Sequence, residues 1–382
     1  MSDLLCWLWL SACKGLTPRG MVKYLQRFGG AREIYYSTED ALRQVEGASR
    51  GEVAALCQKD LRKAEKLEQQ CREKGIGILC MQDAAYPERL RNLEDPPPVL
   101  YVRGSLPAVD DRLCIGVVGT RKASRYGLET ARRLGEELAQ KGAVVVTGLA
   151  AGVDSAAAKG ALQAHGTVIG VLGTGVDVVY PAWNTALQNT VGKIGALVSE
   201  YPPGSKASKA SFPQRNRIIS ALSLGVAIVE APERSGALIT AARAQEQGKD
   251  VFVVPGKVDD PGYYGSHSLI RDGAVLIRSA GDILDEYHFR YPEMLNAAGR
   301  RAAAAREAPK QKMVDKPIGV GYIALEEQLS ELTEQELKIV GILSQGETYA
   351  DLIIRGAELP AGEVLAALTR LQLKGYVQEQ NG

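Results

Sequence analysis

The sequence predicts an α/β fold, in which a doubly wound, mostly parallel β-sheet is covered by helices on both faces. Three observations predict it. From residue 99 onward, short β-branched runs alternate with helical stretches. The runs are apolar along nearly their whole length, which is typical of parallel strands buried on both faces. Between two of them, the stretch 126–140 carries apolar residues at helical spacing, namely Leu128, Ala131, Leu134 and Leu138.

The composition limits the class of protein and the number of domains. The chain has 382 residues, of which 45% are hydrophobic and 24% charged, so wholesale disorder is excluded and two or three domains are expected. Lys and Arg total 46 against 45 Asp and Glu, for a net charge of +1. This balance argues against a chain coated with cations for nucleic acid or anionic membrane, but it leaves room for a local basic site.

Residues 1 to about 80 are predicted to form a helical domain. The turns at 14–16 and 45–47 have the small-residue character of helix-hairpin-helix connections, in which N–H groups at a helix start can meet a phosphate. A plain helical bundle is the alternative. The expected helices are Leu4–Cys13, Pro18–Phe28, Thr38–Val45 and a long Arg50–Lys74.

The first third of the chain also holds all six cysteines, with no CxxC pair and no histidine at ligand spacing. They are therefore predicted to be small buried hydrophobes, and no metal site is expected. The apolar start, residues 4–10, is too short to span a bilayer and follows no basic segment, so neither a secretory signal nor membrane insertion is expected. A reducing cytoplasm is the expected location.

The central domain is expected over residues 81–290, with a Rossmann-like doubly wound sheet. Its composition changes at the run Asp95-Pro96-Pro97-Pro98. The expected strands are Val99–Val102, Cys114–Val118, Val144–Thr147, Val168–Leu172, Leu197–Ser199, Val226–Val229, Val251–Val254 and Val275–Ile277.

A linker is expected over 291–322, where the Ala-, Arg- and Lys-rich run 297–316 is predicted to be mobile. Residues 323–382 then fit a small winged helix-turn-helix module, with helices at Thr333–Leu343, Tyr349–Gly356 and Ala361–Gly375. This module has a net charge of −6 and offers few cations for phosphates, which favours docking on a protein over reading DNA.

Ligands of open α/β sheets bind in the loops that follow the strands, so these loops are the candidate sites. The loop after the strand 114–118 carries Gly119, Thr120, Arg121 and Ser124 at a helix start, which is typical of anion binding, although it is neither a P-loop nor GxGxxG. A tight turn with solvated cations is the alternative. The small-residue loop 147–154 either approaches a ligand or packs closely on the sheet. The loop 173–177 either touches a phosphate or turns the chain, and Asp177 favours the turn.

The basic loop that follows residue 200 is the most informative segment. Residues 201–220 contain four cations and no carboxylate, and residues 116–280 have a net charge of +5. Cations neutralise a nucleic-acid backbone, and an aromatic face such as that of Phe212 stacks on a base whatever the sequence. The pattern predicts single-strand binding; a solvated loop with a core Phe212 is the alternative. The candidate residues here are Lys209, Phe212, Arg215, Asn216 and Arg217.

The sequence offers little evidence of catalytic residues. The three histidines, His165, His267 and His288, have no Ser or Cys partner in a nucleophile motif. Carboxylates end several predicted strands, but they have no defined acid–base spacing. They are Asp154, Asp177, Glu200 and Glu230.

Four motifs in order resemble the DNA-processing protein A (DprA/Smf) family. They are the GTRKAS loop at 119–124, FPQRNRII at 212–219, SGALITA at 235–241 and VPG at 254–256. The similarity runs from about residue 80 to 280. More weakly, the N-terminal region resembles the family's SAM-like or helix-hairpin-helix domain, and the tail resembles its winged-helix module.

The resemblance implies a cytoplasmic, non-catalytic protein that binds single-stranded DNA during natural transformation, protects it and helps to load the RecA recombinase. It also implies an extended Rossmann fold that forms a homodimer, with no cofactor. Arg121 would clamp a phosphate with support from Ser124 and nearby amides, Lys209 would be a basic contact, and Phe212 would stack on a base. Arg215 and Arg217 would contact the backbone or brace the pocket, and Asn216 would bond a base or the loop.

Two departures stand out: His267 occupies a position where the family usually has Asn, and the chain stops soon after Val377. Two other functions remain open. A LOG-type nucleotide phosphoribohydrolase has the motif PGGxGTxxE, but Thr240 stands here in place of the glutamate. A winged-helix transcription regulator is the other, and the acidic tail argues against it.

Overall fold

The structure, a computed structural model, describes residues 2–307, the single positions 335, 339, 353 and 357, and residues 360–373. The chain divides into two compact units, residues 1–308 and 309–382, and each is described by itself.

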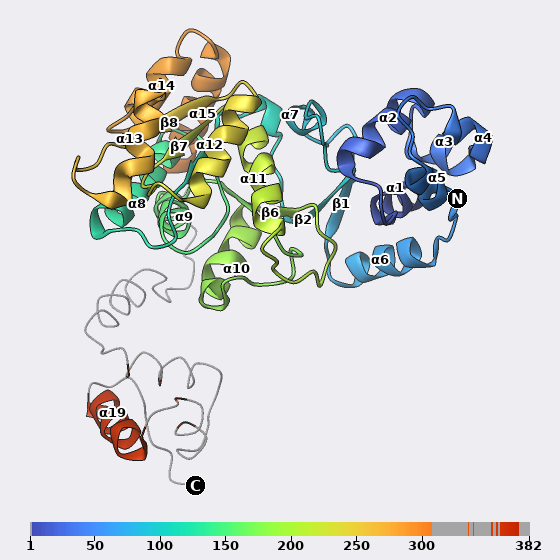
Figure 1. Ribbon diagram of the computed structural model, residues 1–382. Coiled ribbons are helices and arrows are strands. Elements are labelled where there is room, and N and C mark those ends of the chain that lie inside the picture. The colour runs from blue at the N-terminus through green and yellow to red at the C-terminus, as the bar shows by residue number, and fades with distance from the viewer. Residues whose placement is uncertain are drawn as a thin grey trace. The chain divides into compact units, whose positions relative to one another are not determined.

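The first unit is built on one nine-stranded sheet with the order β1-β2-β6-β5-β4-β3-β7-β8-β9 (Figure 1). Strands β3 to β9 pair in parallel, while β2 runs antiparallel to both β1 and β6. The mostly parallel, doubly wound sheet predicted from the sequence is thus confirmed. The strands are β1 Gly77–Cys80, β2 Val99–Gly104, β3 Cys114–Val118, β4 Val144–Thr147, β5 Val168–Val171, β6 Ala196–Ser199, β7 Gly225–Ile228, β8 Asp250–Val253 and β9 Val275–Leu276.

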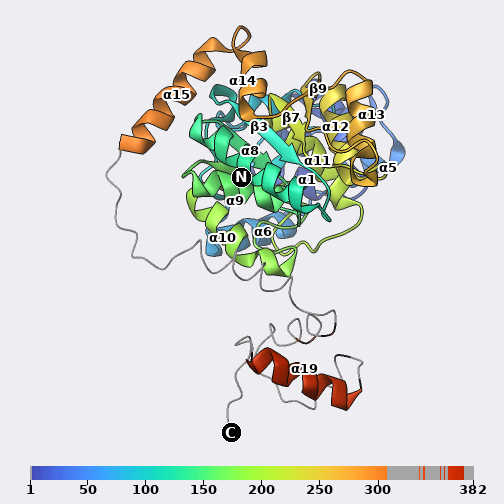
Figure 2. The ribbon, with the colours of Figure 1, turned by 90° about the vertical axis from the view of Figure 1, so that its left-hand side faces the viewer.

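Apolar side chains alternate between the two faces of the sheet. Val145 belongs to one buried cluster, while Val144 and Val146 belong to the cluster on the other face. Each face is then covered by helices, as Figure 2 shows for α8 and α9 on one side of β3 and β7 and for α12 and α13 on the other. The first face carries α8 Arg125–Gln140, α9 Val153–Gln163, α10 Thr185–Ile194 and α14 Ala280–Tyr287. The second carries α7 Glu88–Arg91, α11 Ser211–Leu222, α12 Gly236–Glu246 and α13 Tyr264–Arg271.

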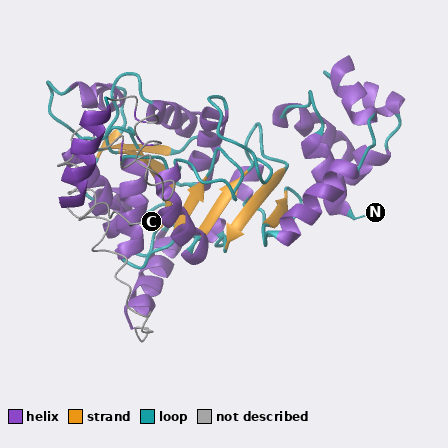
Figure 3. Cartoon of the chain, turned by 90° about the horizontal axis from the view of Figure 1, so that it is seen from below, coloured by secondary structure: helices purple, strands orange, loops and turns teal. Residues whose placement is uncertain are grey.

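The helical domain precedes the sheet, and Figure 3 shows its helices beyond the outermost strand. Its buried residues form one continuous cluster with those under the first face of the sheet. The helices are α1 Asp3–Ala12, α2 Pro18–Phe28, α3 Ala31–Tyr36, α4 Glu39–Arg43, α5 Arg50–Cys57 and α6 Arg62–Glu73.

One prediction for this domain was wrong, and two short elements were missed. The long helix expected over 50–74 is broken after Cys57, because Lys59 turns inward. Its ammonium donates to Ile34 O at 2.9 Å and lies 4.9 Å from the ring of Trp9. Asp60 then accepts from the Arg62 N–H at 3.0 Å, at the start of α6. Helix α3 and strand β1 were missed, because four to six residues are too few to show a period.

Helix α15, Pro292–Glu307, occupies the first half of the predicted linker. Mobility was expected for the run 297–316; its described part, 297–307, continues this helix, since its alanines and arginines favour helix, and Ala298 is buried. In the second unit, α19 Ala361–Leu373 is the third expected helix and buries Val364, Ala367 and Leu371 at helical spacing. The two helices expected before it, and the final β-tip, lie outside the described residues.

Candidate nucleic-acid interface

Loops from several strands meet at the carboxyl edge of the sheet, where the strand order reverses around β3. They enclose a shallow hollow, and Arg121 reaches it from the loop that follows β3. We call Arg121 and the lining residues the strand-end site. The lining residues are Gly148, Ala150, Leu172, Gly173, Thr174, Tyr180, Phe212 and Arg215. Ligands of open α/β sheets bind at this edge.

Arg121 and Phe212 are 91 residues apart in the sequence, yet the structure brings their side chains together. The guanidinium carbon of Arg121 lies 4.8 Å from the centroid of the Phe212 ring, in a cation–π contact. Arg121 is exposed and Phe212 is half-buried. The Phe212 ring packs beside Gly173, where an added Cβ would lie 3.0 Å from Cδ1 of the ring. A cation and an aromatic ring are therefore in direct contact, with the guanidinium over the ring.

The loop 119–124 is shaped from behind by Glu230, a buried carboxylate that follows β7. Glu230 accepts the Ser124 N–H at 3.0 Å and the Ser124 hydroxyl at 2.7 Å, while its carbonyl accepts the Thr120 N–H at 2.8 Å. Ser124 Oγ in turn accepts the Gly127 N–H and caps α8. The donors of Ser124 are thus engaged within the fold, and they hold the loop in place.

Gly119 serves close packing in the same loop. A Cβ at this position would lie 2.5 Å from a methyl group of Val153 at the start of α9. The glycine therefore lets the loop after β3 approach the helix after β4.

Arg215 is buried at the floor of the site, with 4% of its surface exposed. Its Nη1 donates to the carbonyls of Gly148, at 2.8 Å, and Val171, so it joins the ends of β4 and β5. Burial lowers the pKa of Arg215 to about 10, against the opposing effect of Asp154. Burial also raises the pKa of Asp154, which accepts the Gly148 N–H at 3.0 Å. Arg215 is a brace.

Arg217 is also buried, and two carboxylates neutralise it. Its Nη2 lies 2.6 Å from Glu200 Oε2, and its Nε lies 3.0 Å from Asp95 Oδ2. Asn216, between the two arginines, donates weakly to Gly236 O at 3.4 Å. The arginines flanking Asn216 therefore face the protein interior, and sequence reasoning had left open whether they would contact a ligand or brace the pocket.

The exposed cations of the basic loop are Lys206 and Lys209. Neither forms an ion pair with another residue that the structure describes. Ser208 and Ser211 exchange reciprocal hydrogen bonds, N–H to hydroxyl, at 3.2 and 3.0 Å. Since these bonds span Lys209, they fix the backbone that carries the lysine just before Phe212.

The other end of the basic loop is tied to the helical domain, a connection that the sequence analysis missed. Asp177 accepts the Gly204 N–H at 2.8 Å and also pairs with Lys74, which follows α6. Asp177 therefore joins the loop after β5, the basic loop and the helical domain.

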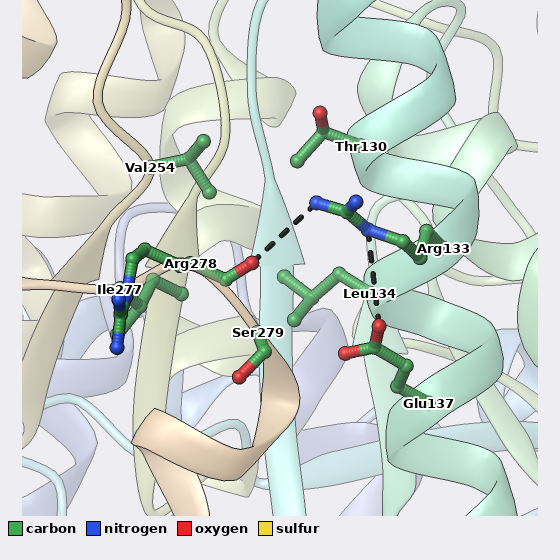
Figure 4. Close-up of a pocket in the computed structure, with 8 residues that line it drawn as sticks. All are labelled: Thr130, Arg133, Leu134, Glu137, Val254, Ile277, Arg278 and Ser279. Carbon is green, nitrogen blue, oxygen red and sulfur yellow. Dashed lines mark hydrogen bonds and ion pairs between the residues drawn. The ribbon is translucent and has the colours of Figure 1, made fainter.

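A second hollow lies along α8 beside the segments that follow β8 and β9 (Figure 4). Two of its charged side chains are engaged within the fold: Arg133 donates to Arg278 O at 3.4 Å and lies 3.8 Å from Glu137, whose carboxylate also accepts the Ala280 N–H. These two groups are therefore already paired.

The histidines and cysteines do not converge. Within residues 2–307 and 360–373, no three His, Cys, Asp or Glu side chains are grouped to hold a metal ion. His267 lies with Nε2 3.2 Å from Gly256 O. All six thiols are free; Cys6, Cys71, Cys80 and Cys114 are buried as predicted, while Cys13 and Cys57 are half-buried. Among the described helices, none has the length and apolar character needed to cross a membrane.

The chain resembles known proteins along its whole length. A relative from Synechocystis, Protein Smf, is 32% identical over 402 residues that cover 100% of this chain and 98% of the relative. The DNA processing protein DprA of Bacillus subtilis is 43% identical over 215 residues, 56% of this chain and 72% of the relative.

Two solved structures are also similar to this chain. DNA processing protein A from Streptococcus pneumoniae superimposes with a TM-score of 0.65 at 34% identity, over 75% of this chain and 98% of that one. DNA processing protein A from Helicobacter pylori, which was solved to show its single-stranded DNA binding mode, superimposes with a TM-score of 0.51 at 31% identity. The match covers 56% of this chain and 97% of that one.

Two family descriptions match the sequence itself. DNA recombination-mediator protein A matches residues 77–288, which include the whole sheet and the strand-end site. The DprA winged helix domain matches residues 324–382. The chain therefore belongs to the DNA recombination-mediator protein A (DprA/Smf) family.

Proposed function

We propose that this chain binds single-stranded DNA, without sequence preference, at the strand-end site and the adjoining basic loop. Family membership gives it a role in DNA processing and recombination. The observation that carries the proposal is the contact between exposed Arg121 and the half-buried Phe212 ring, because a phosphate and a base of one nucleotide need such a pair of surfaces.

The proposed roles of the site residues follow from whether each side chain is exposed or buried. Arg121 and Lys209 face solvent and are proposed to contact phosphates, and Phe212 is proposed to stack on a base. Arg215 and Arg217 are proposed to support the floor of the site, since both are buried and their guanidiniums contact carbonyls or carboxylates. We call the loop 119–124 the phosphate loop. Gly119, Thr120 and Ser124 are proposed to hold it in shape, and Asn216 to bond the basic loop or a base.

We further propose that the chain binds without catalysing a reaction. The strand-end carboxylates named above are all committed within the fold: Asp154 to Gly148, Asp177 to Lys74, Glu200 to Arg217 and Glu230 to Ser124. General acid–base catalysis needs a carboxyl group that can reach substrate. Thr240, which stands in the position of the hydrolase glutamate, is buried and carries no carboxylate.

The wider role extends the same proposal. The chain would act in the cytoplasm as a homodimer through its central domain, protect incoming single strands and load the RecA recombinase onto them. Exposed apolar side chains on neighbouring elements of the second face, Ile239 of α12, Tyr264 of α13 and Leu276 of β9, offer surface for a second copy.

The test is a fluorescence anisotropy titration of the purified protein with single- and double-stranded oligonucleotides at two salt concentrations. Arg121→Ala and Lys209→Ala should each weaken single-strand binding and reduce its dependence on salt, because each removes about one phosphate contact. Lys141→Ala is the matched control: this exposed lysine follows α8, at the opposite end of that helix from the phosphate loop. Wild-type affinity in both folded variants would overturn the proposal.

A further inference from the structure

We propose that Tyr180 and Trp183 form a second base-binding surface, which receives the nucleotides next to the one stacked on Phe212. This inference rests on the proposed function and extends it from a single nucleotide to a short run of single strand. Two large aromatic side chains remain exposed on the segment that follows the loop after β5: Tyr180 is 40% exposed and Trp183 is 69% exposed.

Tyr180 is continuous with the site already described. Its ring centroid lies 5.2 Å from that of Phe212, with an angle of 37° between the planes. The two rings are therefore splayed, and both line the same hollow. A base that stacks on Phe212 would therefore lie next to a second aromatic ring, that of Tyr180.

Trp183 lies close to Tyr180 along the chain. It is in the short 3-10 turn η2, Ala182–Asn184, three residues after Tyr180, so chain length keeps their Cα atoms within about 10 Å. That distance is roughly three bases stacked at about 3.4 Å each.

The fold holds this segment still while leaving its aromatic rings in solvent. The side chain of Asn184 is buried and donates to Leu149 O at 2.9 Å and Ser155 Oγ at 2.8 Å. Val178 O accepts from Thr174 Oγ1 at 3.1 Å and from Gln188 Nε2 at 3.2 Å. The backbone around the rings is thus fixed to the loops that line the site, and a fixed aromatic surface loses less entropy when it binds.

The charges around the segment favour a nucleic acid over a basic protein. Residues 178–199 contain no Asp or Glu, and Lys193 is their one charged residue. Two exposed cations lie near Phe212: Arg121, whose guanidinium lies over the ring, and Lys209, which precedes it by three residues. A polyanion with flat apolar bases fits such a surface, because base stacking on aromatic rings tolerates any sequence.

The tryptophans provide a direct readout. The chain has three, and Trp7 and Trp9 are only 2% and 4% exposed within the helical domain. When the wild-type protein is titrated with oligo-dT, stacking on Trp183 should quench the exposed part of the emission. In Trp183→Phe the quenching should vanish while affinity stays within twofold, since phenylalanine also stacks.

Affinity provides the second readout. Tyr180→Ala and Trp183→Ala should each weaken binding of an oligo-dT about 12 nucleotides long by roughly 5- to 150-fold, which corresponds to about 1–3 kcal/mol per base. Tyr180→Phe should bind as the wild type does. Tyr36→Ala is the matched control, since this exposed tyrosine lies on α3 in the helical domain. Circular dichroism checks that each variant is folded.

The outcomes separate the two proposals. If the wild type binds oligo-dT and Arg121→Ala weakens it, but both alanine variants and the Trp183 emission are unchanged, the single-strand site stands and this extension is overturned. A loss confined to Tyr180→Ala would overturn the assignment of Trp183. If the wild type binds no single-stranded DNA and instead captures a protein through these rings, both proposals fail.

Discussion

Lys74 Nζ lies 2.5 Å from Asp177 Oδ2, and this ion pair connects the end of the helical domain to the loop after β5. The second oxygen of Asp177 accepts the Gly204 N–H, so the same carboxylate also holds the start of the basic loop. The position of the exposed lysines therefore depends on a residue outside the central sheet. This ion pair therefore connects the end of the helical domain to the loop that carries those lysines.

Asp177→Asn should loosen that connection. Since the ion pair is partly solvated, we expect a loss of about 0.2–1 kcal/mol in unfolding free energy and a few-fold loss of single-strand affinity. Urea denaturation and anisotropy measure the two effects. Asp259→Asn, on an exposed loop, is the control and should match the wild type.

The effect of Asp177 should depend on pH. Burial raises the pKa of Asp177, but hydrogen bonds from Lys74 and the Gly204 N–H outweigh it and hold the pKa below the ordinary 3.8. The unfolded chain thus takes up this proton at a higher pH than the folded one, so the stabilisation is present above pH 3.8 and is lost as pH falls below it. The stability difference between wild type and Asp177→Asn should shrink in that acidic range. A difference that stays constant down to pH 2 would contradict the assignment.

Arg121 and Phe212 should be coupled in binding. Because the guanidinium rests on the ring, removing either side chain also changes the position of the other. Phe212→Ala alone should cost about 1–3 kcal/mol of single-strand binding free energy. In a double-mutant cycle with Arg121→Ala, we expect a coupling energy of at least about 0.5 kcal/mol. Strict additivity, measured by anisotropy, would show that the two side chains act on the strand independently.

Glu230 should matter for stability and for the shape of the phosphate loop. Glu230→Gln replaces one accepting oxygen with a donor facing the Ser124 N–H and hydroxyl, so it should cost about 1–3 kcal/mol of unfolding free energy. Ser124→Ala removes the cap of α8 and should cost about 0.5–2 kcal/mol. Both should weaken DNA binding as well. Unchanged urea midpoints would mean that the loop keeps its shape without Glu230.

Gly148→Ala tests how tightly the Arg215 guanidinium packs against the end of β4. An added Cβ would lie 2.6 Å from both terminal nitrogens of this guanidinium, which cannot move away without breaking its bonds to two strand ends. We expect a loss of about 1–3 kcal/mol from overpacking. Gly236→Ala is the matched control, because a Cβ there meets nothing within 4 Å, and it should be neutral or slightly stabilising.

The sheet could be predicted because its strands are continuous apolar runs. The expected bounds of β3 and β4 match the structure, and the other expected strands differ by one or two residues. Short elements without a period, such as β1, could not be found. The loop 119–124 and the basic loop could be singled out as candidate sites from the sequence, since each carries its charged and polar residues close together.

The interior arginines show where local sequence stops being informative. Arg215 and Arg217 lie in a basic run, and nothing near them in the sequence shows that both are buried. The acceptors of Arg215 are 67 and 44 residues away, at Gly148 and Val171, and the carboxylate of Asp95 precedes Arg217 by 122 residues. Only the assembled strand ends reveal which cations remain for a ligand.

The antiparallel pairing of β1 with β2 has a consequence for any shortened form of the protein. Gly77–Cys80 covers the outer backbone groups of β2 from Val99 to Val102. A chain that began at residue 81 would leave this edge open, with unpaired N–H and C=O groups flanked by buried apolar side chains. Such an edge is a template for strand addition between molecules. The helical domain thus ends in a strand that shields the sheet from self-association.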